Sequence, residues 1–488
     1  MSTPQTPLDF GNIQGDIILG LPKKVERYVF FAIKDVKLFR AGLHRLAPAI
    51  TTMKQVIQDR EKIKQHKSGH NKSHLPLSGV NIAFSQFGLN KLGLTDDLGD
   101  TAFKGGQLND ARPLASGGHL GDPFDVSSGD PKWIPEFKKQ IDLVIFISGD
   151  CEERLEERAT EIRHFFGVGT PHPSIEQIYR LQGNVRPGEE KGHEHFGFLD
   201  GISQPAIQNF DTPFPGQETV PAGIILMGND QDPNIATHPA WTKDGSFLVF
   251  RKLAQLVPEF DDFLEQNPIV LPGLTPKAGS EFLGARMMGR WKSGAPIDIT
   301  PLKDDKQLAD DPKRNNNFNY SDTLNVQDRC PFSAHVRKTN PRADLAAFGG
   351  TTKRRIIRQG IPYGPEVTAE EKYSKKTAHD RGLAFVSYQS SIINGFQFIQ
   401  QSWANNINFP LQKPVVPGFD PIIGMNGNGT REFSGSNPSA QEKTLTEPID
   451  FVVPQGGEYF FSPSIKTLKF CRGEGGGVRS ETLMVVGE

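Results

Sequence analysis

The feature of this sequence that most constrains its fold is a dense group of cations around one histidine, between residues 329 and 364. His335 stands in the segment RCPFSAHVRKTNPR, and the segment KRRIIRQGIPYG follows after a short Gly/Thr-rich connection. The cations of this region are Arg337, Lys338, Arg342, Lys353, Arg354, Arg355 and Arg358. So many cations are difficult to bury without an anionic ligand, because each desolvated charge needs a partner.

The residue types alone leave two interpretations of this region open. A single histidine on an apolar face is most often a hydrogen-bonded core residue, and a run of charges is most often a solvated surface. Imidazole and guanidinium groups together also suit an iron porphyrin, which needs an axial nitrogen and partners for its carboxylates.

Motifs elsewhere in the chain favour the second interpretation. HFGFLDGISQP precedes the cationic region, and its residues 197–201 read GFLDG. With CPFSAHVRKTNPR, RRIIRQGIPYG, NIQGDI near the N-terminus and GLAFVSYQSSIINGFQFIQQSW further on, it resembles the dye-decolorizing peroxidases, in particular their fungal branch. The resemblance spans nearly the whole chain. It implies a haem b peroxidase that uses hydrogen peroxide to oxidise bulky aromatic donors, such as anthraquinone dyes and phenolics, through a high-valent iron intermediate.

The resemblance also assigns roles to four residues at the haem. It implies that His335 is the proximal iron ligand, Asp200 the distal acid/base and Arg358 the distal arginine. Asp420, in the segment GFDPIIG, is the expected acceptor for the second imidazole nitrogen. From the residues alone, Asp200 before Gly201 and Asp420 before Pro421 would be ordinary turn residues.

Five further residues are expected at the site. Arg337 lies two residues after the ligand and is predicted to bind a haem propionate. Leu383 and Phe385 share one face of a predicted strand, and the resemblance makes them walls of the distal pocket. Tyr363 and Trp403 stand where the family has surface oxidation sites, which relay electrons from donors too large to enter, although packing of an amphipathic ring is the commoner role.

The order of predicted elements indicates an α+β fold. Residues 25–33 and 141–148 are rich in β-branched and aromatic residues and predict buried strands, as do 223–228 and 467–470 in the second half. Helical spacing lies between such strands, which favours an antiparallel sheet with helices packed on it. The resemblance implies two ferredoxin-like domains of the dimeric α+β barrel type: residues 1–218, which carry the distal motif, and 219–488, which carry the proximal histidine and most of the haem pocket.

Composition excludes several classes of partner. Lys plus Arg number 55 against 57 Asp plus Glu, so bulk charge favours neither nucleic acid nor an anionic membrane. No apolar run reaches the 18 or so residues of a membrane-spanning helix. The N-terminus shows no signal-peptide pattern, which leaves a cytoplasmic protein or a mature secreted one, and the resemblance favours secretion. A monomer or weak dimer is expected.

Three other readings stay open at this point. A haem- or iron-handling protein would bind the same cofactor without fast turnover. His193, Glu194 and His195 could serve a metal hydrolase, although no third ligand is evident nearby. His66, His70 and His74 would share one helix face, although Ser68 and Gly69 make a helix there doubtful.

Overall fold

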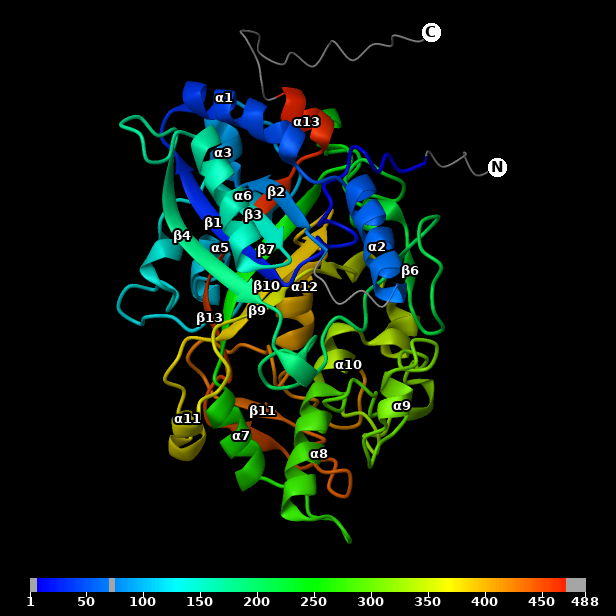
Figure 1. Cartoon of the computed structure of the whole chain (residues 1–488). Helices are drawn as coiled ribbons and strands as arrows, with labels where there is room; N and C mark the ends of the chain where they lie inside the picture. Colours follow the sequence, from blue (N-terminus) through cyan, green and yellow to red (C-terminus); the bar gives the residue numbers. More distant parts are fainter. Residues whose placement is uncertain (1–6, 70–74, 471–488) are drawn as a thin grey trace.

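Nine strands of this chain form one sheet that closes on itself (Figure 1). The computed structural model describes residues 7–69 and 75–470. The strand order is β7-β13-β2-β3-β1-β4-β9-β10-β8, and a further pairing of β7 with β10 closes the barrel. All of these pairings are antiparallel. Two small two-stranded sheets, β5-β6 and β11-β12, lie outside it.

The strands of the barrel come from both halves of the sequence. They are β1 Val25–Ile33, β2 Ser78–Phe84, β3 Leu143–Gly149, β4 Ile175–Asn184, β7 Ser246–Gln255, β8 Ile357–Arg358, β9 Ile361–Tyr363, β10 Gly382–Gln389 and β13 Val452–Ser462. The small sheets are formed by β5 Ala206–Ile207, β6 Thr219–Val220, β11 Arg431–Phe433 and β12 Leu445–Glu447.

Helices surround the barrel in two groups. In Figure 1, α1, α3, α6 and α13 lie around its upper end, and α7 to α10 belong to the lower part of the molecule. The helices are α1 Val36–Leu46, α2 Met53–Ser68, α3 Gln86–Lys91, α4 Thr101–Gly105, α5 Gln107–Asp110, α6 Glu152–Phe165, α7 Val257–Gln266, α8 Pro276–Met288, α9 Lys306–Ala309, α10 His335–Thr339, α11 Ala369–Ser374, α12 Phe396–Phe398 and α13 Ile465–Phe470. A π-helical segment, Ile399–Ala404, continues α12.

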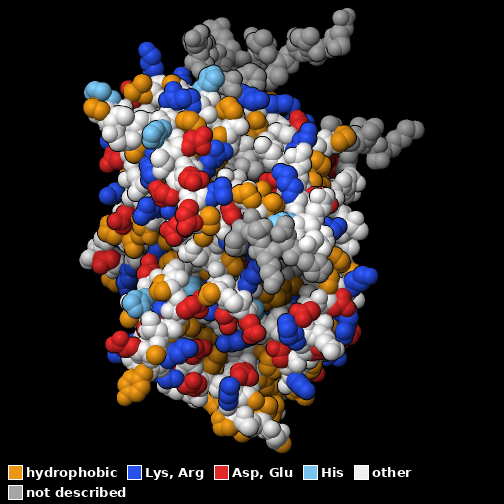
Figure 2. Space-filling view, viewed as in Figure 1, with side chains coloured by type: hydrophobic (Ala, Val, Ile, Leu, Met, Phe, Trp, Pro, Cys, Tyr) orange, Lys and Arg blue, Asp and Glu red, His pale blue; other side chains and the backbone are white. Residues whose placement is uncertain are grey.

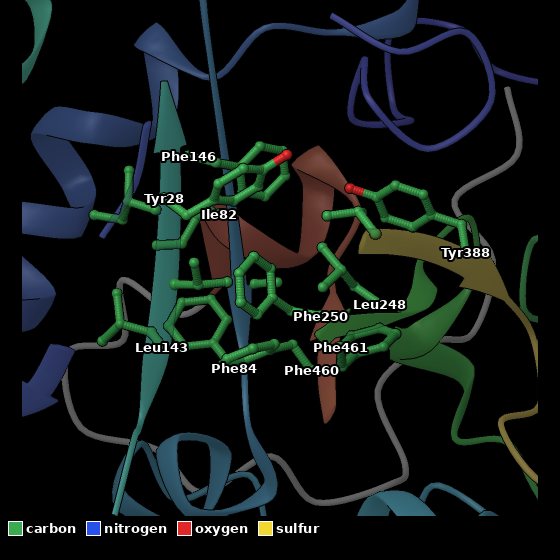
Figure 3. Packing of buried hydrophobic residues seen from close by; sticks show 14 of the residues in the cluster. Tyr28, Ile82, Phe84, Leu143, Phe146, Leu248, Phe250, Tyr388, Phe460 and Phe461 are labelled. Carbon is green, nitrogen blue, oxygen red and sulfur yellow. The ribbon is translucent and has the colours of Figure 1, made fainter. Parts of the chain in front are cut away.

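Aromatic side chains fill the interior of the barrel. Tyr28 on β1 contacts Phe250 on β7 with 5.2 Å between ring centroids, and Phe146 on β3 with 6.0 Å. Figure 3 shows these rings pointing toward one another. Strands β1 and β7 are not neighbours in the sheet, so Tyr28 and Phe250 meet across the barrel. Burial of such large apolar surfaces is the main stabilising contribution to a core of this kind.

A second apolar cluster lies beside the barrel core. It is built largely from α7, α8 and the segments that follow them, and it includes Phe260, Phe282 and Trp291. The barrel cluster draws on β1 to β4 together with β7, β10 and β13. A large cavity is lined by residues of both clusters, so the two cores fix its walls.

The α+β barrel class predicted from the sequence is confirmed, and β1 covers the predicted range 25–33. Two predicted strands are wrong. Residues 223–228 form tight turns, in which the backbone N–H of Leu226 donates to the carbonyl of Ala222 at 2.8 Å. Residues 467–470 belong to α13, because Ser464 caps that helix by accepting a hydrogen bond from the N–H of Thr467.

The histidines at four-residue spacing in the first half form no metal site within the described part of the chain. His66 lies in the last turn of α2, whereas His70 and His74 lie outside the described residues. In residues 7–69 and 75–470, no group of three or more His, Cys, Asp or Glu side chains could hold a metal ion.

The described surface agrees with the balanced composition. On the face in Figure 2, basic and acidic side chains are interspersed rather than gathered by sign. None of the described helices has both the length and the apolar character needed to cross a membrane.

We expect Phe250→Ala to lower the free energy of unfolding by about 3–5 kcal/mol, because it leaves a cavity where three other rings meet. Urea unfolding followed by circular dichroism measures this. Val270→Ala is the control, because Val270 is 82% exposed and its change should stay within about 0.5 kcal/mol. Equal effects of the two substitutions would contradict the packing described here.

Candidate functional site

A cavity of about 1650 Å³, including its open mouth, lies between the barrel and the second apolar cluster. Its walls combine apolar side chains with one imidazole, acidic groups and several guanidinium groups. The residues that line it include Glu194, Asp200, Arg290, His335, Arg342, Arg354, Arg355, Arg358, Leu383, Phe385 and Phe396. This combination is typical of a site for a large, mainly apolar ligand with anionic substituents.

His335 is the imidazole of this cavity, and it begins the short helix α10. Its Nδ1 lies 2.9 Å from Oδ2 of the buried Asp420. The other oxygen of Asp420 accepts hydrogen bonds from the N–H groups of Ile422 and Ile423, at 2.8 and 3.0 Å. The carboxylate is therefore fixed in place and holds the Nδ1 proton of the imidazole. This leaves the Nε2 lone pair of His335 available as a ligand.

The pKa of Asp420 supports this arrangement. Burial acts to raise it, but the attraction and hydrogen bond of His335, together with the two backbone donors, bring it below the usual value. Asp420 is therefore a carboxylate at neutral pH. The structure thus brings together the predicted ligand and its predicted acceptor.

Asp200 and Arg358 form a second pair at the cavity. Nη1 of Arg358 donates to Oδ1 of Asp200 at 2.7 Å, and the same oxygen accepts a hydrogen bond from the N–H of Gly201 at 2.6 Å. Burial acts to raise the pKa of Asp200, but the charge and hydrogen bond of Arg358 outweigh it and keep the pKa below its usual value. Asp200 is therefore an ionised base, and its carboxylate lines the cavity.

Glu194 positions the turn that carries Asp200, a role that the sequence reasoning missed. Its carboxylate accepts hydrogen bonds from the N–H groups of Phe196 and Phe198, at 2.9 and 2.8 Å, and from the side chain of Gln255. Nε2 of His195 donates a hydrogen bond to the carbonyl of Tyr363 at 2.9 Å. Glu194 and His195 of the possible hydrolase triplet are therefore engaged in structural bonds, and no metal-binding group of three or more His, Cys, Asp or Glu side chains occurs among the described residues.

The cations at the cavity have few carboxylate partners. Arg290 and Arg342 donate mainly to backbone carbonyls and to the side chain of Asn316. Arg355 lies 3.5 Å from Glu218, but its buried Nε has no hydrogen-bond partner. Burial lowers the pKa of Arg290 and of Arg355 to about 10, so both still carry a charge at neutral pH. Buried cations with so few carboxylate partners favour an anionic ligand.

These observations fit an iron porphyrin. The free Nε2 of His335 is the kind of nitrogen that serves as an axial ligand, and the arginines offer partners for two carboxylates. The apolar walls match a flat aromatic macrocycle.

Arg337 does not lie where the sequence led us to expect it. Its guanidinium is fully buried away from the cavity, donates to both oxygens of Asp344 at 2.7 and 2.9 Å, and lies over the rings of Tyr320 and Phe332. Because α10 turns the side chain at the second position after His335 into the core, Arg337 supports the helix rather than facing a ligand. Arg290, Arg342, Arg354 and Arg355 line the cavity in its place.

Leu383 and Phe385 line the cavity from β10. The strand period of two directs both side chains to the same face, as expected. Phe385 contacts Phe396, with 5.9 Å between ring centroids.

The prediction that Tyr363 and Trp403 lie at the surface is wrong, because each is only 3% exposed. Trp403 lies in the π-helical segment, and its ring stacks on that of Phe409 with 5.3 Å between the centroids. The hydroxyl of Tyr363 donates to Asp380 at 3.2 Å, and Nζ of Lys252 lies 4.8 Å from its ring centroid. A large donor therefore cannot contact either ring fully, and electrons would have to pass through the atoms that cover them.

Comparison with known proteins identifies the family of this chain. The family model of the DyP dimeric alpha+beta barrel domain matches residues 12–187, and that of the Dyp-type peroxidase C-terminal domain matches residues 196–408. The chain is 45% identical over 477 residues to a dye-decolorizing peroxidase of Auricularia auricula-judae. That alignment covers 95% of this chain and 87% of the relative.

Solved structures agree with this. An ancestral D-type dye-decolorizing peroxidase is 59% identical with a TM-score of 0.91, and a dye-decolorizing peroxidase in complex with 2,6-dimethoxyphenol is 47% identical with a TM-score of 0.84. Each alignment covers 96% of this chain and 100% of the solved chain. With both domain models matched and its fold shared throughout, this chain belongs to the Dyp-type peroxidase family.

Proposed function

We propose that the cavity holds haem b and that the protein uses hydrogen peroxide to oxidise bulky aromatic donors, including anthraquinone dyes and phenolics. The observation that carries this proposal is that one cavity is lined by His335, supported by Asp420, and by the ion pair of Asp200 with Arg358. When bound, the haem supplies the open iron position and the redox capacity for reaction with peroxide.

His335 would hold the iron through Nε2, and Asp420 would keep the imidazole in the required tautomer. Arg290, Arg342, Arg354 and Arg355 are the candidates to bind the propionates. These guanidinium groups are positioned in advance by bonds to carbonyls and amides, so little side-chain entropy would be lost on binding.

Asp200 is suited to move a proton of peroxide. As a carboxylate it can accept the proton from one peroxide oxygen, and as an acid it can return that proton to the oxygen that leaves as water. Arg358 would stabilise the negative charge that develops on the leaving oxygen. A haem-handling protein without turnover would give this ion pair no task.

Donors too large for the cavity require another route. Trp403 and Tyr363 are our candidates for electron relay from beneath the surface, and a small phenol such as the 2,6-dimethoxyphenol bound by one relative is the kind of donor that needs no relay. We also retain an extracellular location, a monomeric or weakly dimeric state and a division of the chain near residue 218 as proposals.

We expect the haem-loaded protein to show a Soret band that changes within seconds of adding one equivalent of hydrogen peroxide. Asp200→Asn should retain the band but react about 10²–10⁴-fold more slowly, because the proton acceptor is lost. Stopped-flow absorption measures the rate. Asp310→Asn is the matched control, since Asp310 is exposed and pairs only with Lys306 within the described residues. A band indifferent to peroxide would favour haem handling, and an unchanged rate in Asp200→Asn would remove its acid/base role.

We expect Arg358→Leu to shift the acid limb of the peroxide reaction to higher pH. The active form of Asp200 is the carboxylate, so the rate is lost as pH falls through its pKa, which Arg358 holds below the usual value. Without Arg358, only the N–H of Gly201 and the attraction of His335 oppose the effect of burial, so the pKa rises. The rate constant of the peroxide reaction, measured from about pH 2 to about pH 7, checks this. That range extends to both sides of the usual carboxyl pKa of about 4. An acid limb that stays in place, at whatever absolute rate, would contradict the assignment.

Trp403→Phe should lower the turnover of an anthraquinone dye far more than that of 2,6-dimethoxyphenol. Phenylalanine keeps the stack on Phe409 but is much harder to oxidise than an indole. The kcat for both donors measures the difference. Trp291→Phe provides the control, because Trp291 is also buried and stacked on a phenylalanine, whereas Trp403 alone of the two shares a helical segment with the cavity-lining Ile399 and Gln400. Equal losses for both donors would argue against a relay through Trp403.

A further inference from the structure

We propose that Tyr459 is a redox-active residue of this peroxidase. Tyr459 gives an electron to the cofactor held in the cavity, and it gives its phenolic proton to Asp110, beside the exposed His119. The inference rests on the proposed function, because the reaction with peroxide supplies the oxidising equivalent. Tyr459 lies on β13, outside the sequence motifs that carry the family resemblance.

Two phenylalanine rings connect Tyr459 to the cavity. Phe385 and Phe396 both line it, with their ring centroids 5.9 Å apart. The ring of Phe396 lies 6.3 Å from that of Tyr459, in an edge-to-face arrangement. Tyr459 is therefore one ring behind the cavity wall, and aromatic groups occupy the whole interval.

A carboxylate receives the phenolic hydrogen bond. The hydroxyl of Tyr459 donates to Oδ2 of Asp110 at 2.6 Å. Oδ1 of Asp110 lies 2.7 Å from Nδ1 of His119, and Nε2 of Gln397 donates to both oxygens at 2.9 Å. The side chain of His119 is 41% exposed, whereas that of Asp110 is buried. The three side chains thus form a continuous path for a proton from the buried phenol to the surface.

Burial decides how this phenol could be oxidised. Burial first, and the nearby Asp110 second, raise the pKa of Tyr459 well above its usual value, so the phenolate is not populated. Removing an electron alone would leave a positive charge in the core, which is costly. Transfer of the proton to Asp110 at the same time leaves a neutral phenoxyl radical, and the hydrogen bond is already formed.

Tyr363 and Tyr388, which are also buried, lack one part of this arrangement. The hydroxyl of Tyr363 donates to Asp380 at a longer 3.2 Å, and Nζ of Lys252 lies 4.8 Å from its ring centroid. Tyr388 donates to Asp16 at 2.9 Å, but no aromatic ring of the described residues contacts it. Both Tyr388 and Asp16 are buried.

The O–H bond of Tyr459 breaks, and its proton forms a new O–H bond on Asp110. Its electron reduces, by one equivalent, the cofactor that peroxide has oxidised. An aromatic donor in solution then returns one electron to the phenoxyl group, and the proton returns from Asp110. Tyr459 would hold an oxidising equivalent inside the protein until a donor arrives.

Rapid-freeze electron paramagnetic resonance of the haem-loaded protein, mixed with one equivalent of peroxide and no donor, tests this. We expect a tyrosyl signal that loses most of its intensity in Tyr459→Phe and persists in Tyr388→Phe, the matched control for loss of a buried hydroxyl bonded to a carboxylate. His119→Ala, at an exposed position, should lower the yield as well without disturbing the core.

The outcomes separate the inference from the proposed function. If the Soret band of the wild type does not respond to peroxide, the proposed function fails. If it responds but the tyrosyl signal is absent, persists in Tyr459→Phe or is lost equally in Tyr388→Phe, the role of Tyr459 is overturned. Should Tyr459→Phe not fold, an unchanged signal in His119→Ala would overturn the proton path.

Discussion

The pairing of β7 with β10 is the interaction on which the rest of the structure depends. It runs along the whole of β10, from Gly382 opposite Ala254 to Gln389 opposite Phe247, and it turns an open sheet into a closed barrel. The same strand presents Leu383 and Phe385 to the cavity and binds β8, which carries Arg358, on its other edge. The position of Arg358 therefore follows from the closure of the barrel.

The electrostatics of the cavity have a consistent pattern. Each ionisable group assigned to the chemistry has a partner within hydrogen-bond distance: His335 with Asp420, and Asp200 with Arg358. The arginines assigned to ligand binding are bonded mostly to neutral acceptors instead. The buried positive charge thus destabilises the folded protein, and an anionic ligand would offset part of that destabilisation. Binding and folding should therefore be coupled in this protein.

Short motifs allowed the sequence to predict the site better than the fold around it. His335, Asp200 and Arg358 lie in segments whose resemblance to the family is local, and the structure brings them to one cavity. The helix direction at Arg337 and the burial of Trp403 depend on contacts with Asp344 and Phe409, which no local pattern contains. Barrel closure depends on strands that are far apart in sequence. A signal for Glu194 was present, since an acidic side chain just before a glycine turn can accept the N–H groups of that turn.

The place of β13 in the sheet has a consequence for synthesis of the chain. β13 lies between β7 and β2, and it pairs with β7 along its whole length. Until residues 452–462 have left the ribosome, these two neighbours present unpaired edges, and their aromatic faces lack the rings of Phe460 and Phe461. Such edges are sites of aggregation, and contacts of long sequence separation form slowly. The chain should therefore pass through a vulnerable state late in translation, in which a chaperone that covers strand edges would improve the yield of folded protein.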